Sequence, residues 1–416
     1  MTWLIDKFLT VQPQLARFAQ ATGIIAYAGL QWLILLRLLP IGGYELVGSY
    51  ALAQAVVAPV VGFFAFSLRP LWVSGALGEL SAGSVLAVRI TTGMVALTMA
   101  IVITLTFQIR LDAMIFTYVL ASKFLDMVSD ILAAIFDRQG KSAISGLLLI
   151  MKSALLSLVI LAGWTAQFDL STIVSTLVIV QACIVIAEWK LSGSARPFGL
   201  FKFSQWLAVI PLATALFAAV NSLVASVAGF LPRYLLELFA DRETVGYFST
   251  IFIPVLMIQM IATGLSQTHL HQLSRVARLG EIRQTFLASA PVAMLIVGLH
   301  MAITILVFLA AAFVDWGWEN QRSLLHDVAF VLVLSLPLGL RQFYSYLAMS
   351  TGRMTAIFTT SAILLAVQAL LAPWAIQTEG IFGCVILMSA GAVVQIGTYL
   401  WILRKPVQPM AEYQHG

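Results

Sequence analysis

Long apolar segments follow one another along almost the whole chain. A segment of about 20 predominantly apolar residues is long enough to cross a bilayer as a helix. With 61% hydrophobic and only 10% charged residues, a soluble fold of 416 residues has no means of burying so much apolar surface. The sequence therefore predicts an all-α polytopic membrane protein.

The segments predict about twelve transmembrane helices, six in each half of the chain. The expected spans are 18–37, 46–67, 84–107, 113–136, 143–164 and 171–188, and then 206–229, 244–266, 285–313, 326–349, 355–374 and 381–403. We expect an N-terminal lobe over 1–188, a cytoplasmic linker over 189–205, a C-terminal lobe over 206–404 and a cytoplasmic tail over 405–416. The short connections leave no room for an extramembrane domain.

Short sequence matches relate the two halves. Glu45 to Gly48 (ELVG) is matched about 198 residues later by Glu243 to Gly246 (ETVG), and Arg37 is matched by Arg233. Two more pairs follow in the same order, Gly78-Glu79 with Gly280-Glu281 and Gly140-Lys141 with Gly352-Arg353. Such an internal repeat indicates two similar halves. After six spans the chain is back on the side of the membrane where it began, so the second half is expected to have the same orientation as the first. The two halves would then be related by an axis along the membrane normal.

Lysines and arginines in the short loops predict the orientation. About sixteen lie on the side that holds the N-terminus and about five lie on the opposite side. In membrane proteins, the side with the excess of lysines and arginines is usually the cytoplasmic one. Both termini are therefore expected in the cytoplasm.

Charged residues inside the spans are the candidate functional residues, because a charge at the bilayer centre costs about 2.5 to 3.5 kcal/mol on insertion scales. The span 113–136 carries Lys123, Asp126 and Asp130 on one face of a helix. The two acids are candidates for coupling transport to an ion gradient, and Lys123 is a candidate for binding cargo. The alternative is a static pair of Lys123 with Asp126, and another of Asp130 with Arg341.

Three further cations are predicted to bind cargo. Arg341 lies in the span 326–349 at the expected depth of Asp130, and Arg37 and Arg233 lie near the outer ends of the first spans of the two halves. Guanidinium groups bind anionic groups such as phosphates in a bidentate manner. The alternatives are that both outer arginines extend to the head groups, or that Arg233 pairs with the nearby Glu237.

No motif in the sequence predicts an enzyme. There is no glycine-rich phosphate loop, no paired-aspartate motif in a loop and no His-Asp dyad. Cys183 and Cys384 both lie inside apolar segments, so neither a disulfide framework nor a thiolate metal site is indicated. We expect no cofactor and no metal.

Three stretches carry a family resemblance: SYALAQAVVAPVVGFFAFSLRPL (49–71), SKFLDMVSDILAAIFDRQGK (122–141) and LPRYLLELFADRETVGYFS (231–249). With the twelve expected spans, they resemble the Wzx-type polysaccharide flippases (O-antigen and exopolysaccharide translocases) of the multidrug, oligosaccharidyl-lipid and polysaccharide (MOP) exporter superfamily. Many relatives have up to fourteen spans, whereas twelve are expected here.

The resemblance implies two six-helix lobes around a cationic cavity and an alternating-access cycle in the bacterial cytoplasmic (inner) membrane. The implied activity moves a polyprenyl-pyrophosphate-linked oligosaccharide from the inner to the outer leaflet, for O-antigen, exopolysaccharide or lipopolysaccharide biosynthesis. The implied partners are this lipid-linked glycan, membrane lipids, and a glycan polymerase or glycosyltransferases of the same pathway, with no nucleic acid.

Two other functions remain open. An ion-coupled multidrug antiporter of the same superfamily would favour net acidic lobes, whereas the spans here hold at least as many cations as acids. A membrane glycan polymerase, ligase or acyltransferase is disfavoured by the short outer loops.

Overall fold

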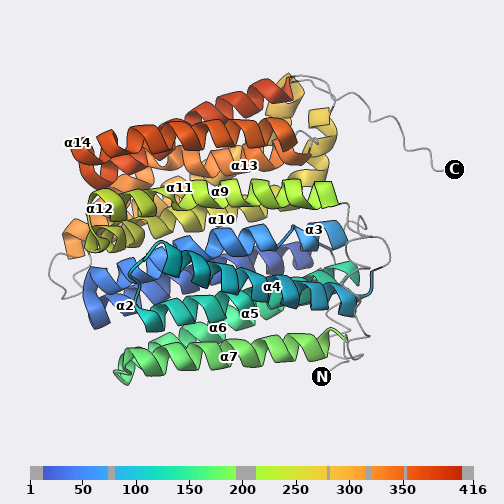
Figure 1. The fold of residues 1–416 in the computed structure, drawn as a ribbon. Coiled ribbons are helices and arrows are strands. Elements are labelled where there is room, and N and C mark those ends of the chain that lie inside the picture. The colour runs from blue at the N-terminus through green and yellow to red at the C-terminus, as the bar shows by residue number, and fades with distance from the viewer. Residues whose placement is uncertain are drawn as a thin grey trace. The chain divides into compact units, whose positions relative to one another are not determined.

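The structure is a computed structural model that describes residues 13–73, 80–193, 212–278, 282–313, 321–350 and 354–404. These residues form an all-α fold (Figure 1). The helices are α2 (Pro13–Phe64), α3 (Leu68–Val73), α4 (Ala82–Thr106), α5 (Ala113–Arg138), α6 (Ser142–Thr165), α7 (Leu170–Leu191), α9 (Leu212–Phe239), α10 (Arg242–Arg278), α11 (Ile282–Phe313), α12 (Gln321–Leu334), α13 (Leu336–Ser350) and α14 (Met354–Leu403). Most of the predicted linker and all of the predicted tail (194–205 and 405–416) lie outside the described residues.

Short polar side chains begin several helices. The side chains of Ser81, Asp112 and Asp169 each accept a hydrogen bond from the backbone N–H three residues later, at the starts of α4, α5 and α7. Asp241 does the same for the Thr244 N–H at the start of α10. Each of these side chains satisfies one of the N–H groups that a helix leaves free in its first turn. Short loops therefore suffice to begin each new helix.

Eight helices in the described part of the chain are long and apolar enough to cross a membrane, or nine if the bent pair α12 and α13 is one span. The chain is thus a multi-pass membrane protein. Two of these candidates, of 43 and 49 residues, lie within α2 and α14 and exceed the roughly 20 residues that one crossing needs. α2 is broken at Gly42 and Gly43, and α14 at Gly380, where the backbone is not helical. These breaks favour the predicted twelve spans, a count that stays a prediction.

Two prolines lie inside helices without ending them. α2 continues through Pro40 to its glycine break, and α9 continues through Pro232 to Phe239. A proline removes one backbone hydrogen bond and bends a helix, and surrounding helices in a bundle can hold the bent form.

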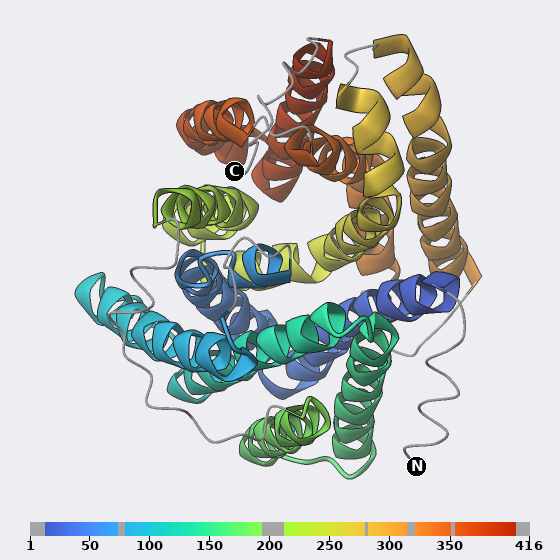
Figure 2. The ribbon, with the colours of Figure 1, turned by 90° about the vertical axis from the view of Figure 1, so that its right-hand side faces the viewer.

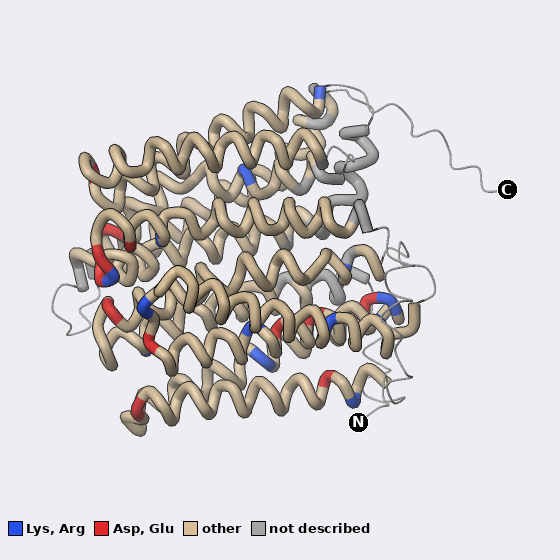
Figure 3. Tube along the Cα trace, viewed as in Figure 1, with Lys and Arg blue, Asp and Glu red and all other residues tan. Residues whose placement is uncertain are grey.

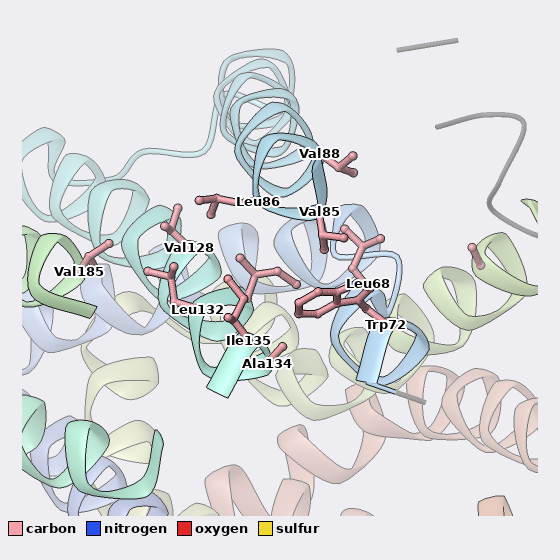
Figure 4. Packing of buried hydrophobic residues seen from close by; sticks show 12 residues of the cluster. Leu68, Trp72, Val85, Leu86, Val88, Val128, Leu132, Ala134, Ile135 and Val185 are labelled. Carbon is pink, nitrogen blue, oxygen red and sulfur yellow. The ribbon is translucent and has the colours of Figure 1, made fainter. Parts of the chain in front are cut away.

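The chain divides into two compact units, Met1–Thr250 and Ile251–Gly416. In the first unit α2 packs against α4, α5, α6 and α9, and α7 lies beside α5 and α6 (Figures 1 and 2). One apolar core of this unit joins α3, α4, α5 and α7; Figure 4 shows Leu68 and Trp72 of α3 beside Val85 of α4, with Ile135 of α5 close by. The second unit has its own core, to which Phe343, Leu347 and Tyr399 of α13 and α14 belong.

Two glycines that the internal repeat makes equivalent lie together in the first unit. A Cβ atom on Gly48 would overlap the carbonyl oxygen of Arg242, and a Cβ atom on Gly246 would overlap the carbonyl oxygen of Tyr44. Tyr44 and Arg242 are themselves equivalent under the repeat, so the contact is reciprocal. A local two-fold relation between the two segments produces such a reciprocal contact.

Candidate functional site

A buried group of polar side chains lies between four helices of the first unit, and we call it the central polar cluster: Tyr27 of α2, Asp126 of α5, Lys152 of α6 and Gln181 of α7. Asp126 is its centre. Lys152 Nζ donates to Asp126 Oδ1 at 2.6 Å, Gln181 Nε2 donates to the same oxygen at 2.9 Å, and the Tyr27 hydroxyl donates to Oδ2 at 2.5 Å. Gln181 Nε2 also donates to the Ser122 carbonyl at 3.2 Å. One carboxylate thus links three neighbouring helices to α5.

The ion-pair partner of Asp126 differs from the one that sequence spacing predicted. We expected Lys123, three residues earlier on the same helix, but the structure pairs Asp126 with Lys152 of α6. Lys152 is 2% exposed, whereas Lys123 is only half-buried. Sequence reasoning passed over Lys152, although a lysine in the middle of the span 143–164 was a signal that could have identified it. Tyr27 and Gln181 gave no comparable signal.

Further polar side chains extend from α2 beside this cluster. The Tyr50 hydroxyl donates to Gln31 Oε1 at 3.0 Å, and Gln54 Nε2 donates to the Tyr50 hydroxyl oxygen at 3.1 Å. The Tyr50 and Tyr118 rings stack with their centroids 6.3 Å apart, which brings this group to α5. Hydrogen-bonded polar groups thus occupy the interior of a bundle whose outer residues are apolar.

A second group, the arginine–aspartate cluster, consists of Arg69, Arg89, Asp130 and Asp137. Arg69 donates to Asp130 at 2.9 Å and to Asp137 at 2.8 Å, and Arg89 donates to the other oxygen of Asp130 at 2.9 Å. The remaining nitrogens of Arg89 donate to the carbonyl oxygens of Met127 and Ala65. The cluster therefore joins α3, and the turn that precedes it, to α4 and α5.

This cluster corrects the expected partner of Asp130. The alternative to a coupling role was a pair with Arg341, but both carboxylate oxygens of Asp130 are bound by Arg69 and Arg89. Asp126 lies in the central polar cluster and Asp130 in the arginine–aspartate cluster. The structure thus separates the two acids that the sequence grouped as coupling candidates.

Arg37 contacts the end of α6. One of its terminal nitrogens donates to the carbonyl oxygens of Gly163 at 3.1 Å and Phe168 at 2.9 Å, and its guanidinium lies 5.9 Å from the centroid of the Trp164 ring. The side chain is buried, unlike one that extends to the head groups. Mostly apolar residues of α2, α5, α6 and α7, with Arg37 itself, line a small pocket there.

Arg233 is also buried, and its partner is not the predicted one. Its Nε donates to the Ser249 hydroxyl at 3.1 Å, and its guanidinium lies 5.0 Å from the centroid of the Phe230 ring. Glu237, which we considered as its partner, pairs with Arg242 at 2.7 Å instead.

Arg341 lies on α13 in the second unit. Its Nη1 donates to Gln395 Oε1 of α14 at 3.4 Å, and Gln395 in turn lies 3.5 Å from the Ser361 hydroxyl. These long contacts leave the guanidinium more weakly held than those of Arg69 and Arg89.

The charges of the described chain gather mainly toward the helix ends, and a smaller group lies part-way along the helices (Figure 3). Among the described residues, the buried charged side chains are four cations and one acid: Arg37, Arg89, Lys152 and Arg233, and Glu188. The same part of the chain contains no group of three or more His, Cys, Asp or Glu side chains suited to holding a metal ion.

The chain is similar to solved structures over nearly its full length, at low identity. It matches a mutant of the MATE transporter VcmN of Vibrio cholerae with a TM-score of 0.62 and 14% identity, over 96% of this chain and 97% of that one. It matches an inward-facing multidrug-resistance MATE transporter of the MOP superfamily with a TM-score of 0.60 and 15% identity, over 93% of each chain. A MOP-superfamily transporter of Pyrococcus furiosus has a TM-score of 0.62 and 13% identity, over 95% of this chain and 98% of that one.

No protein-family model matches the sequence, and no curated protein matches it. The structural matches show that the chain has the same fold as these MATE and MOP-superfamily proteins.

Proposed function

We propose that this protein is a flippase that moves a polyprenyl-pyrophosphate-linked oligosaccharide from the inner to the outer leaflet, for the synthesis of a surface polysaccharide. The observation that carries the proposal is a pair of buried cations, Arg37 and Arg233, that form no ion pair with any described acid, whereas the buried Arg89 and Lys152 pair with Asp130 and Asp126. The transporter fold supplies the class of activity, and the charge balance supplies the class of cargo.

The physical reason is the cost of burying charge. An ionised side chain inside a membrane protein is expensive unless it is paired, and such residues typically mark substrate or ion pathways. A transporter with excess interior cations suits an anionic cargo, whereas a carrier of cationic drugs suits excess acids. The Pyrococcus furiosus transporter gives a precedent, since reversed polarity of its binding pocket suggests a different function within this fold.

The proposal includes the arrangement expected from the sequence. The protein has about twelve spans in two parallel lobes, 1–188 and 206–404, with both termini in the cytoplasm of a bacterium, and it works by alternating access. Its partners are the lipid-linked glycan, membrane lipids, and the polymerase or glycosyltransferases that act on the same glycan.

The proposed cargo-binding cations remain Arg37, Lys123, Arg233 and Arg341. Arg341 and Lys123 are half-buried, and Arg341 makes only long polar contacts in the described chain, so both are suited to exchange protein contacts for phosphate oxygens. Arg37 and Arg233 hold other groups of the protein, and cargo binding by them requires those contacts to change.

The test is flipping in proteoliposomes. The purified protein is reconstituted with a fluorescent polyprenyl-pyrophosphate oligosaccharide, and arrival in the opposite leaflet is measured by protection from a membrane-impermeant quencher. Arg341→Gln and Lys123→Gln are expected to slow flipping, while Lys141→Gln, which changes an exposed lysine in a turn, serves as the matched control.

Two results would overturn the proposal. In the first, the unmodified protein is fully reconstituted, yet the lipid-linked oligosaccharide stays accessible to the quencher. The other is proton-driven uptake of cationic dyes by the same vesicles without flipping, which would assign the chain to the multidrug antiporters.

A further inference from the structure

Glu188, near the end of α7, is the one acid among the buried charged side chains of the described residues, and it is 5% exposed. Its carboxylate has a side-chain hydrogen bond with Ser129 of α5. The other oxygen, Oε2, is buried and has no hydrogen-bond partner in the part of the chain that the structure describes. Burying a carboxylate anion that has an unbonded oxygen costs much more free energy than burying the neutral carboxylic acid.

Glu188 is connected to the central polar cluster. It follows Gln181 by seven residues, which places the two on one face of α7, about 10.5 Å apart along the axis. On α5, Ser122, Asp126 and Ser129 lie on one face by the same rule. Gln181 bonds to Ser122 and Asp126, and Glu188 bonds to Ser129, so the two polar rows face each other between α5 and α7.

The charged groups that act on Glu188 are few. The side chains of Lys152 on α6 and Asp126 on α5 interact electrostatically with the Glu188 carboxylate. These two side chains also form an ion pair with each other at 2.6 Å. With all three ionised, these residues carry one net negative charge, and the half-buried Lys123, three residues before Asp126, is the next cation on α5. Binding one proton forms one O–H bond on the Glu188 carboxylate and brings the three residues to zero net charge.

We propose that Glu188 is a proton-binding site of this transporter, and that it takes up and releases the coupling proton while Asp126 stays ionised against Lys152. Glu188 thereby takes the coupling role for which the sequence suggested Asp130, both of whose carboxylate oxygens are bonded to arginines. Movement of α7 against α5 breaks the Ser129 contact and changes the solvation of the carboxyl, which alternately favours the acid and the anion. The coupling role rests on the proposed function, whereas proton binding at Glu188 does not.

The direct test needs no substrate. Infrared difference spectra of the purified full-length protein, recorded between neutral and alkaline pH, where exposed carboxylates stay ionised, report a protonated carboxylic acid by its C=O stretching band. We expect such a band in the unmodified protein, its loss in Glu188→Gln and its retention, shifted in frequency, in Glu188→Asp. Glu45→Gln, which removes an exposed acid, is the matched control and should keep the band. A band that persists unchanged in Glu188→Gln overturns the proposal.

The transport test separates coupling from cargo. In vesicles with an imposed pH gradient, Glu188→Gln is expected to lose most of the gradient-driven acceleration of flipping while it still flips slowly without a gradient. Full acceleration in Glu188→Gln, at equal protein density, overturns the coupling role. If the unmodified protein flips no lipid-linked oligosaccharide, the proposed function fails, while the infrared band still decides whether Glu188 binds a proton.

Discussion

The Lys152–Asp126 pair shows how much a single buried contact contributes. Lys152 is almost completely buried and Asp126 is 22% exposed. Removing one partner of such a pair leaves the other charge unpaired, which typically costs about 3 to 5 kcal/mol. Lys152→Met should therefore lower the free energy of unfolding by this amount, measured by chemical denaturation in detergent micelles.

Lys123→Met is the matched control, because Lys123 is the neighbour that sequence spacing selects. It should cost much less than Lys152→Met, and Lys152→Met with Asp126→Leu should recover part of the loss. Equal losses for the two single lysine variants would contradict the pairing seen in the structure.

Arg37 gives a second prediction at this scale. Its bonds to the Gly163 and Phe168 carbonyls hold the chain where α6 ends. A hydrogen bond to a charged group contributes roughly 1.5 to 3 kcal/mol, so Arg37→Ala should lower the thermal unfolding temperature, and Arg37→Lys should lower it less. Unchanged thermal stability with reduced flipping in both variants would show that Arg37 contacts cargo and does not serve the fold.

At the scale of helices, Gly48 and Gly246 mark a close approach of two backbones in the first unit. Gly48→Ala or Gly246→Ala should push α2 and α10 apart, because a Cβ at either position overlaps backbone of the other helix. Spin labels at Glu45→Cys and Glu243→Cys, two exposed and equivalent positions, should report a longer distance in either alanine variant. Gly229→Ala on α9 is the control, since a Cβ there meets nothing within 4 Å. An unchanged label distance would contradict the close approach.

The start of α7 supplies a pH dependence. Hydrogen bonds from Ser171 and from the Thr172 side chain and backbone lower the pKa of the exposed Asp169 carboxyl. A depressed folded-state pKa gives stability that is present above the ordinary pKa of an aspartate and is lost as pH falls through the lowered value. Amide hydrogen exchange at Thr172 and Ile173 should therefore lose protection on acidification through that range.

Asp169→Asn keeps an oxygen that caps the helix but does not titrate. In this variant the protection at Thr172 and Ile173 should no longer depend on the ionisation of residue 169. Persistence of the same acid dependence would show that another group causes it.

For the whole molecule, the loop charges predict the topology. Reporter fusions after Asp169 and Glu379 should report the outside of the cytoplasmic membrane, and fusions after Lys141 and Arg404 the inside. Both sets exchange their readings if the orientation is the reverse of the one predicted.

Much of the fold could be predicted from the sequence, and the side-chain partners could not. The predicted spans 84–107, 113–136, 143–164 and 171–188 agree with α4 to α7 to within about three residues. Long apolar segments ended by polar residues carry that information. α9 extends about ten residues beyond its predicted end because its proline does not stop it.

The partners depend on which helices are neighbours, and spacing within one helix does not show this. Asp126 has a lysine three residues before it on α5, yet its partner comes from α6. Glu188 falls at the very end of a predicted span, where sequence reasoning reads an acid as a boundary residue. Its burial becomes visible only when α5 and α6 are placed beside α7.

The reciprocal contact of Gly48 and Gly246 also bears on how such a chain arises. In a symmetric dimer of two identical half-length chains, the same glycine would form both sides of this contact. A single mutation would then change both sides at once. Duplication and fusion into one chain remove that constraint. Equivalent positions beside this contact hold different side chains, as Tyr44 and Arg242 show, while both segments hold glycine at the contact itself, where the backbone-to-backbone approach tolerates no Cβ from either side.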